Sequence, residues 1–143
     1  MRVADVNLLL YAVDESSPHH ERARLWLEAE LSGPETFALS WTVLLAFVRL
    51  STNPHVFDTP LEAEEALDLV RSWLAQPTVT VVHPTERHAG LLRELLGPLG
   101  AAGNLTTDAH LAALAIEHGA ELCSADADFS RFPRLRWTNP LAT

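Results

Sequence analysis

The chain contains no lysine, a single cysteine, and no apolar run long enough to span a membrane. Its ten basic residues are all arginine, and the nineteen acidic residues bring the formal net charge to −9. Such a surface does not attract nucleic acid or anionic membranes non-specifically, so a polyanionic substrate must be met by a local patch or by metal ions. One cysteine cannot form an internal disulfide, and Cys123 stands in an apolar strand pattern that favours a small buried hydrophobe over a redox centre.

We also expect no secretion signal in the N-terminal stretch. One arginine is followed by Asp5 and Asn7, with no small-residue cleavage site after an apolar segment. Repeats, low-complexity tracts and linkers are absent as well. At 143 residues and 48% hydrophobic, the chain has the size of one domain with a substantial core, so we expect a single domain over residues 1–143. We expect a cytoplasmic protein with no membrane partner.

Short apolar runs alternate with segments of helical periodicity along the chain. Such alternation predicts an α/β fold with a parallel sheet covered on both faces. Pro18, Ser40 and Gly119 suit helix ends. The expected strands lie near Val3–Ala4, Phe37–Ala38, Val79–Val82, Glu121–Cys123 and Arg136–Trp137, and the expected helices run from Asn7, Pro18–Leu31, Trp41–Leu50, Leu61–Leu74, Glu86–Leu96 and Asn104–His118.

Acidic residues stand at the ends of several expected elements. Asp126 and Asp128 follow the strand that ends at Cys123, and Asp5 closes the first strand. Ligand sites in open α/β sheets lie just outside the carboxyl ends of strands. Asp108 stands near the start of a long helix, on the stripe that faces the sheet. Each acid by itself is equally consistent with a helix cap or a turn.

Together the acids point to a metal site. Two carboxylates about 4 Å apart repel by roughly 4 kcal/mol at an effective dielectric constant near 20, and protons or cations must relieve this repulsion. Oxygen-only ligands suit Mg²⁺ or Mn²⁺, which keep positions free for water and for phosphate oxygens of a substrate. The pattern therefore favours metal-dependent phosphoryl chemistry.

Four stretches resemble PIN domains, and more closely the VapC-type ribonuclease toxins of bacterial toxin–antitoxin pairs. They follow the family's order and spacing nearly end to end. No single motif is very specific, whereas the ordered set is. The stretches are Asp5–Tyr11, Leu44–Leu50, Thr107–Ala115 and Asp126–Phe129.

The resemblance implies a PIN-like three-layer α/β/α sandwich with a mostly parallel sheet of four to five strands. It also implies endonucleolytic cleavage of RNA that leaves 5′-phosphate and 3′-hydroxyl ends, with Mg²⁺ or Mn²⁺ as cofactor, neutralisation by a cognate antitoxin, and a plausible homodimer. Carried over onto this chain, Asp5, Asp108 and Asp126 are expected as catalytic metal ligands, with Asp128 as a weaker, supporting member.

One position departs from the family. Ala46 stands where PIN domains usually have a glutamate, so the acidic pocket is one carboxylate short. Helical spacing places Thr42, Ala46, Arg49 and Asn53 on one face, which we expect to look into the pocket. Water or the Thr42 hydroxyl can fill the space, and Arg49 is the candidate phosphate contact, although an arginine on a helix is more often solvated or salt-bridged.

Other residues are expected to be structural. His19 and His20 read as a solvated pair, and His110 as turned away from Asp108. Arg131, Arg134 and Arg136 form the one local basic stretch, equally suited to RNA, a partner's acidic tail or solvent. The four tryptophans, Trp26, Trp41, Trp73 and Trp137, read as core or interface fillers rather than base-stacking platforms.

Two other functions remain open. Ala46 is consistent with a catalytically weak PIN domain that only binds RNA or an antitoxin. A phosphatase of the haloacid dehalogenase type also carries an Asp-x-Asp after a strand, but that motif normally comes at the start of the chain, and here it comes near the end.

Overall fold

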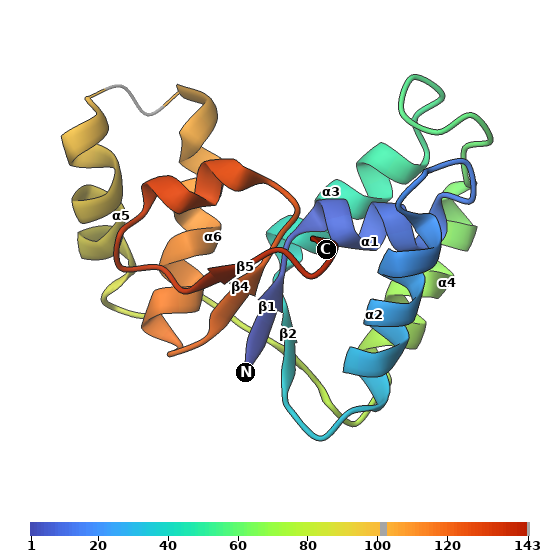
Figure 1. The fold of residues 1–143 in the computed structure, drawn as a ribbon, viewed down its shortest axis with the longest axis horizontal. Helices are drawn as coiled ribbons and strands as arrows, with labels where there is room; N and C mark the ends of the chain where they lie inside the picture. The colour runs from blue at the N-terminus through green and yellow to red at the C-terminus, as the bar shows by residue number, and fades with distance from the viewer. Residues whose placement is uncertain (101–102, 143) are drawn as a thin grey trace.

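A five-stranded parallel sheet lies at the centre of the molecule (Figure 1). The structure is a computed structural model that describes residues 1–100 and 103–142, with only the backbone at 104. The strand order is β3-β2-β1-β4-β5, and every neighbouring pair is parallel. The strands are β1 (Arg2–Ala4), β2 (Phe37–Leu39), β3 (Val79–Val81), β4 (Glu121–Cys123) and β5 (Trp137–Thr138).

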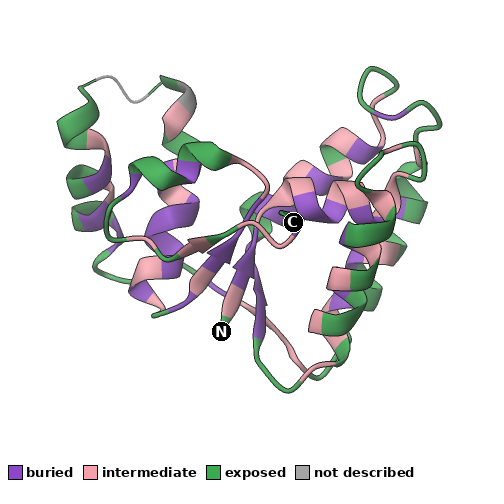
Figure 2. Ribbon diagram, viewed as in Figure 1, coloured by how far each residue is buried: buried purple, intermediate pink, exposed green. Residues whose placement is uncertain are grey.

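The strands are short, and their central members are buried on both faces. Phe37, Ala38 and Leu39 of β2 have no exposed surface, and Figure 2 shows burial concentrated along the central strands. A parallel sheet has this character because the crossover helices cover both faces. With three residues in most strands, the sheet depends on these helices for its stability.

Helices flank the sheet on two sides (Figure 1). On one side lie α5 and α6, and on the other lie α1 to α4. The predicted three-layer α/β/α arrangement of the PIN fold is therefore confirmed, with five parallel strands. The helices are α1 (Val6–Val13), α2 (His20–Ser32), α3 (Trp41–Ser51), α4 (Ala63–Leu74), α5 (His88–Leu96) and α6 (Thr106–Glu117).

Four helices begin two residues later than the sequence pattern predicts. Pro18 lies in a turn rather than in the first turn of α2, which starts at His20. Helix α4 starts at Ala63 rather than at the predicted Leu61, because Glu62 and Glu65 form a capping box at its N-terminus. Likewise α5 begins at His88 and α6 at Thr106. Ser40 caps α3 as predicted, with its hydroxyl accepting from the Val43 amide.

Short 3₁₀ turns occupy two segments for which the pattern predicts no structure, and a third overlaps the start of the helix predicted from Asn104. They comprise η1 (Gly97–Leu99), η2 (Gly103–Leu105) and η3 (Ala127–Arg131). Gly119, with φ of +63°, ends α6 in the left-handed conformation that favours glycine. Of the glycine-rich stretch 97–103, residues 101 and 102 lie outside the described residues.

Three of the four tryptophans pack in or against the core. Trp73 is buried against Phe47, with ring centroids 4.8 Å apart, and Trp26 and Trp137 pack at the edge of the core. Trp41, in the first turn of α3, is 46% exposed, so its predicted role as an interface residue stays a prediction. In the described part of the chain, no helix is long and apolar enough to cross a membrane.

Adjacent leucines in α3 provide a stability test. Leu44 has no exposed surface, whereas Leu45 is 63% exposed. Leu44→Ala should lower the free energy of unfolding by about 2–5 kcal/mol, because it leaves a cavity in the core. Leu45→Ala, the matched control, should change it by less than about 0.5 kcal/mol. Urea denaturation followed by circular dichroism measures both, and equal losses would contradict the assigned faces of α3.

Candidate metal centre and its pocket

The site begins where β1 and β4 end side by side. Ala4 pairs with Cys123 in the sheet, so Asp5 and Ser124 follow directly at neighbouring strand ends. Asp5 is also the N-cap of α1, where its Oδ1 accepts a hydrogen bond from the Val6 amide at 2.7 Å. The strand end and the helix start together fix this carboxylate.

The second oxygen of Asp5 is held from β4. Its Oδ2 accepts from the Ser124 hydroxyl at 2.6 Å and from the Asn7 side-chain amide at 3.3 Å. Burial raises the pKa of Asp5, and the nearby Asp126 raises it further, while the hydrogen bonds from Ser124 and Val6 act in the opposite direction. Asp5 is thus a partly desolvated carboxylate with most of its lone pairs in use.

Ser124 and Asn7 tie the two strand ends together. Ser124 is fully buried, and its Oγ accepts from the Asp126 amide at 3.0 Å. Asn7 bridges the other way, with its Oδ1 accepting from the Ala125 amide at 3.3 Å. The sequence prediction assigned neither residue a role. The available signal was their spacing, two residues after Asp5 and two residues before Asp126.

Three acids converge next to the hydrogen bonds made by Ser124 and Asn7. Asp108, Asp126 and Asp128 each offer a carboxylate oxygen, and these oxygens lie within 4.8 Å of one another. Asp126 caps η3, with its Oδ1 accepting from the Asp128 amide at 2.9 Å, and this turn brings Asp128 back beside it. Asp108 comes from the first turn of α6. Asp5 lies in the same pocket as Asp108 but outside this group of three.

The pKa of Asp108 reflects the surroundings of this acidic cluster. Partial burial, followed by Asp5, Asp126 and Asp128 in that order, raises its pKa to about 6. Among the described residues, no cationic side chain lowers it. Position near the N-terminus of α6 should favour ionisation, so burial and the neighbouring carboxylates together outweigh the helix dipole.

The donor set fits a hard divalent cation. Mg²⁺ binds oxygens at 2.0–2.1 Å, so two ligands on opposite sides of the ion lie about 4 Å apart. The separation of up to 4.8 Å in the cluster needs only a small side-chain rotation, which the exposed Asp128 can supply. Such an ion offsets the mutual repulsion of three neighbouring carboxylates. Exposed acidic residues also cluster where no ion binds. The raised pKa of Asp108 is therefore a second observation, besides the spacing of the oxygens, that supports a cation here.

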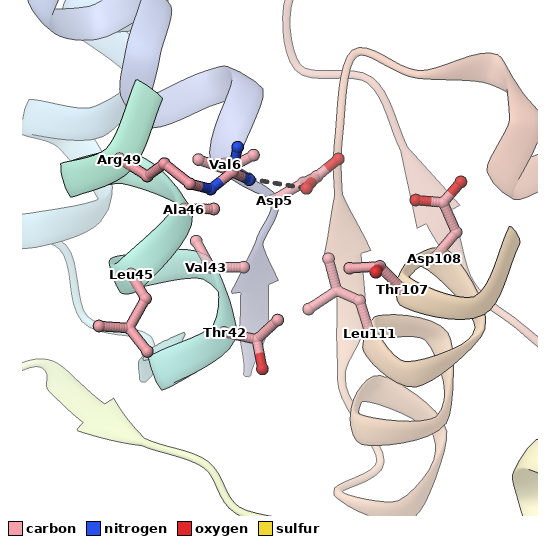
Figure 3. Close-up of a pocket in the computed structure, with 10 residues that line it drawn as sticks. All are labelled: Asp5, Val6, Thr42, Val43, Leu45, Ala46, Arg49, Thr107, Asp108 and Leu111. Atoms are coloured by element: carbon pink, nitrogen blue, oxygen red, sulfur yellow. Dashed lines mark hydrogen bonds between the residues drawn. The ribbon is translucent and has the colours of Figure 1, made fainter. Parts of the chain in front are cut away.

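A pocket of about 400 Å³ opens beside the acids, between α3 and α6. Figure 3 shows Asp5 and Asp108 on its two walls, with Ala46 and Arg49 projecting from α3. The predicted face of α3 does line the pocket, since Thr42, Ala46 and Arg49 all border it. The Ala46 methyl group stands where a longer acidic side chain would reach toward the acids.

The two predicted substrate contacts differ in their surroundings. Among the described residues, the exposed Arg49 guanidinium makes no side-chain hydrogen bond or ion pair. Thr42 is engaged, because its Oγ1 lies 3.1 Å from Nε2 of His110. His110, for which the sequence predicts only that it points away from Asp108, thus bonds Thr42 on the opposite wall of the pocket.

His110 belongs to a hydrogen-bonded chain that the sequence did not reveal. Its Nδ1 lies 2.9 Å from Nε2 of His88, and Nδ1 of His88 is bonded to the Glu117 carboxylate. Thr85 donates to the same carboxylate through its amide at 2.7 Å and through its hydroxyl. The one available signal is the spacing of His110 and Glu117, two turns apart on α6.

The other polar candidates stay peripheral. Arg134 pairs with Glu94, and Arg136 donates to the Gly119 carbonyl at 2.8 Å. Arg131 lies 3.8 Å from Asp128. His20 bonds the Tyr11 carbonyl at 3.0 Å. The basic stretch is thus largely engaged in local contacts.

Comparison with known proteins gives one matching family model and close relatives. A model of the PIN domain matches residues 2–135. Ribonuclease VapC37 of Mycobacterium tuberculosis is 47% identical over 142 residues, which is 99% of each chain. The VapC ribonuclease Mb2897 of Mycobacterium bovis is 40% identical over 99% of this chain and 96% of its own length.

Solved structures share the fold at lower identity. VapBC2 from Rickettsia felis, solved bound to a DNA fragment from the promoter of the pair, has a TM-score of 0.71 and 22% identity over 96% of this chain and 97% of its own. Mycobacterium tuberculosis VapC20, described as a toxin that cleaves the sarcin-ricin loop, has a TM-score of 0.62 and 22% identity over 95% and 99%.

The raised pKa of Asp108 predicts a pH-dependent effect on stability. Between about pH 4 and pH 6 the unfolded carboxyl loses its proton while the folded one keeps it, so the folded state loses stability as pH rises and the full penalty remains above pH 6. Asp108→Asn should therefore stabilise the metal-free protein above pH 6, by about 1 kcal/mol after allowance for solvent screening.

Chelator-treated wild type and Asp108→Asn compared by thermal unfolding near pH 7.5 and pH 4 measure this difference. The gain should be much smaller at the lower pH, where the folded carboxyl is protonated and the unfolded one is about half protonated. Asp68→Asn on the exposed face of α4 is the control and should be neutral. Destabilisation by Asp108→Asn at the higher pH would show that the carboxylates do not repel one another.

Proposed function

Because the chain belongs to the PIN domain family, and within it to the VapC group, we propose that it is a metal-dependent endoribonuclease toxin neutralised by a cognate antitoxin. It cleaves RNA to leave 5′-phosphate and 3′-hydroxyl ends, and Mg²⁺ is the cofactor, with Mn²⁺ as a substitute. The observation that carries the proposal is the convergence of Asp108, Asp126 and Asp128 beside an open pocket, with the pKa of Asp108 raised by burial and then by the nearby carboxylates.

The residues that hold the cation have distinct tasks. Asp108, Asp126 and Asp128 would supply its oxygen ligands, and Asp5 completes the acidic wall as a further ligand, direct or through water. When bound, Mg²⁺ would supply positive charge for a phosphate oxygen and would lower the pKa of a water that serves as nucleophile. Ser124 and Asn7 keep Asp5 and the backbone of Asp126 in register, which holds the reacting geometry.

Arg49 completes the pocket on the α3 side. The rest of the surface is acidic, so a polyanionic RNA needs a local cation besides the metal. The guanidinium of Arg49 is exposed and borders the same pocket as Asp5 and Asp108, and its donors match the geometry of a phosphate. It is therefore the proposed contact for a phosphate next to the scissile one.

Exposed apolar side chains at the rim of the pocket form a surface suited to an antitoxin. Trp41 and Leu45 of α3 are 46% and 63% exposed, and Leu45 also lines the pocket. An apolar segment of a partner laid over these side chains would cover the pocket and exclude RNA. Several solved neighbours are VapBC pairs, which supports a partner of this kind. A homodimer stays a prediction.

A catalytically weak PIN domain that only binds RNA or an antitoxin is the second candidate function. Ala46 favours it, because it removes a carboxylate that the family usually has. Three acids remain clustered without that carboxylate, which supports turnover by this chain.

A cleavage assay tests the proposal directly. With Mg²⁺, the wild-type protein should cleave total bacterial RNA, and Asp108→Asn or Asp126→Asn should reduce the rate at least about a hundredfold, because each removes a ligand. Asp68→Asn is the charge-matched control and should keep the wild-type rate. Chelator should abolish cleavage, and Mn²⁺ should restore it. Equal, chelator-resistant cleavage by wild type and Asp108→Asn would refute the metal mechanism.

Ala46→Glu separates the two candidate functions. For an active nuclease with a complete three-acid site, the added carboxylate should change the cleavage rate by no more than about tenfold. A binding module should instead show no cleavage as wild type and a large gain in the variant. Ala46→Gln, which adds the same bulk without the charge, controls for the filling of the pocket.

A further inference from the structure

The hydrogen-bonded chain behind Thr42 sets which way its hydroxyl points. It runs from Thr85 through Glu117, His88 and His110 to Thr42, and it joins a buried carboxylate to the wall of the pocket. We propose that this chain fixes the Thr42 oxygen as a hydrogen-bond acceptor toward the substrate, so that Thr42 selects the ribose 2′-hydroxyl. The inference rests on the proposed nuclease function, because it names the group that distinguishes RNA at that site.

The direction of the chain begins at Glu117. Its side chain has no exposed surface and accepts two hydrogen bonds from Thr85. Burial opposes ionisation, yet the bonds from Thr85 and His88 outweigh it, and the pKa of Glu117 is lowered. An ionised carboxylate has acceptors only, so Nδ1 of His88 must carry a proton and donate it.

The remaining donors and acceptors follow one by one. In a neutral ring, Nε2 of His88 is then unprotonated and accepts a hydrogen bond from Nδ1 of His110 at 2.9 Å. In the same way, Nε2 of His110 is unprotonated and accepts a hydrogen bond from the Thr42 hydroxyl at 3.1 Å. The proton of Thr42 is therefore used within the protein. Only the lone pairs of its oxygen are left for a ligand in the pocket.

The groups around the two rings keep this order. The measurements that follow are made near pH 8, above the usual imidazole range. Arg87 points its guanidinium to the Glu117 carbonyl at 2.8 Å and not to the side-chain carboxylate. No other charged side chain of the described residues is bonded to His88 or His110.

An acceptor in this place has few partners on a nucleic acid. Phosphate oxygens and the sugar ring oxygen only accept hydrogen bonds. Along the backbone, the 2′-hydroxyl is the donor, and it is the group by which proteins distinguish RNA from DNA. Thr42 lines the same pocket as Asp5 and Asp108, and Figure 3 places it at the end farther from Asp5. Because Thr42 borders the same pocket, we place there a sugar next to the phosphate that the acids and their ion would hold.

The test compares sugars that differ only in this donor. Random-sequence RNA oligonucleotides are measured against a matched 2′-fluoro pool, which keeps the RNA-like sugar pucker but lacks the proton. Binding is measured near pH 8 with Ca²⁺, which takes the same oxygen ligands as Mg²⁺. The wild-type protein should prefer the 2′-hydroxyl pool by roughly threefold to tenfold, the range for one hydrogen bond.

Two variants of Thr42 show whether its hydroxyl carries the preference. Thr42→Val keeps the shape and removes the oxygen, so the two pools should bind equally. Thr42→Ser is the matched control, and its hydroxyl should retain the preference. A purely structural Thr42 would weaken binding of both pools together. An unchanged ratio in Thr42→Val would overturn the proposal.

Glu117→Gln tests the chain without touching the pocket. The glutamine oxygen can still accept from Thr85, but its amide donates to Nδ1 of His88 and reverses every later bond. Thr42 then accepts from His110 and turns its own proton outward. The preference for the 2′-hydroxyl should fall to about one while RNA binding persists. A retained preference in a folded Glu117→Gln protein would refute the relayed polarity.

These outcomes are separate from those of the nuclease proposal. The binding ratio needs no cleavage, so a protein that binds RNA with the preference but never cuts it would contradict the proposed activity and support the role of Thr42. A protein that cleaves RNA in a metal-dependent way without any 2′-hydroxyl preference would do the reverse.

Discussion

The repulsion among carboxylates at the ends of β1 and β4 is the constraint on which the site depends. The sheet places Asp5 and the segment after Cys123 side by side, and α6 adds Asp108 from across the pocket. In the described part of the chain, the one arginine paired with these acids is Arg131, which lies 3.8 Å from Asp128. The folded chain therefore holds negative charge that a proton or a cation relieves, in accord with the pKa of Asp108, which burial and then the nearby carboxylates raise.

Around this charge the protein is rigid on one side and open on the other. Ser124 and Asn7 fasten the two strand ends with hydrogen bonds, and the core beneath them is fully buried. The opposite wall, α3, contributes the small Ala46, the unpaired Arg49 and the exposed Trp41 and Leu45. Such a division suits a site that must keep its ligands fixed while it exchanges a substrate and a protein partner.

Much of this architecture could be predicted from the chain. The alternation of elements and the order of the family motifs led to the sandwich, and the positions of Asp5 and Asp126 after apolar runs led to the strand ends. Asp128 was expected to be only a support, and its place in the cluster comes from η3, a turn with no clear pattern. The chain through His88 and Glu117 was missed, because it depends on how α5 and α6 pack rather than on spacing within either helix.

The most direct measurement of the central claim is the location of a bound ion. Crystals of the protein grown with Mn²⁺ and measured at its absorption edge should give an anomalous peak within ligand distance of the carboxylates of Asp108, Asp126 and Asp128. Asp5 should lie near the same peak, in contact with the ion or with a water bound to it. A well-ordered acidic pocket with no peak, or a peak elsewhere in the molecule, would contradict the account.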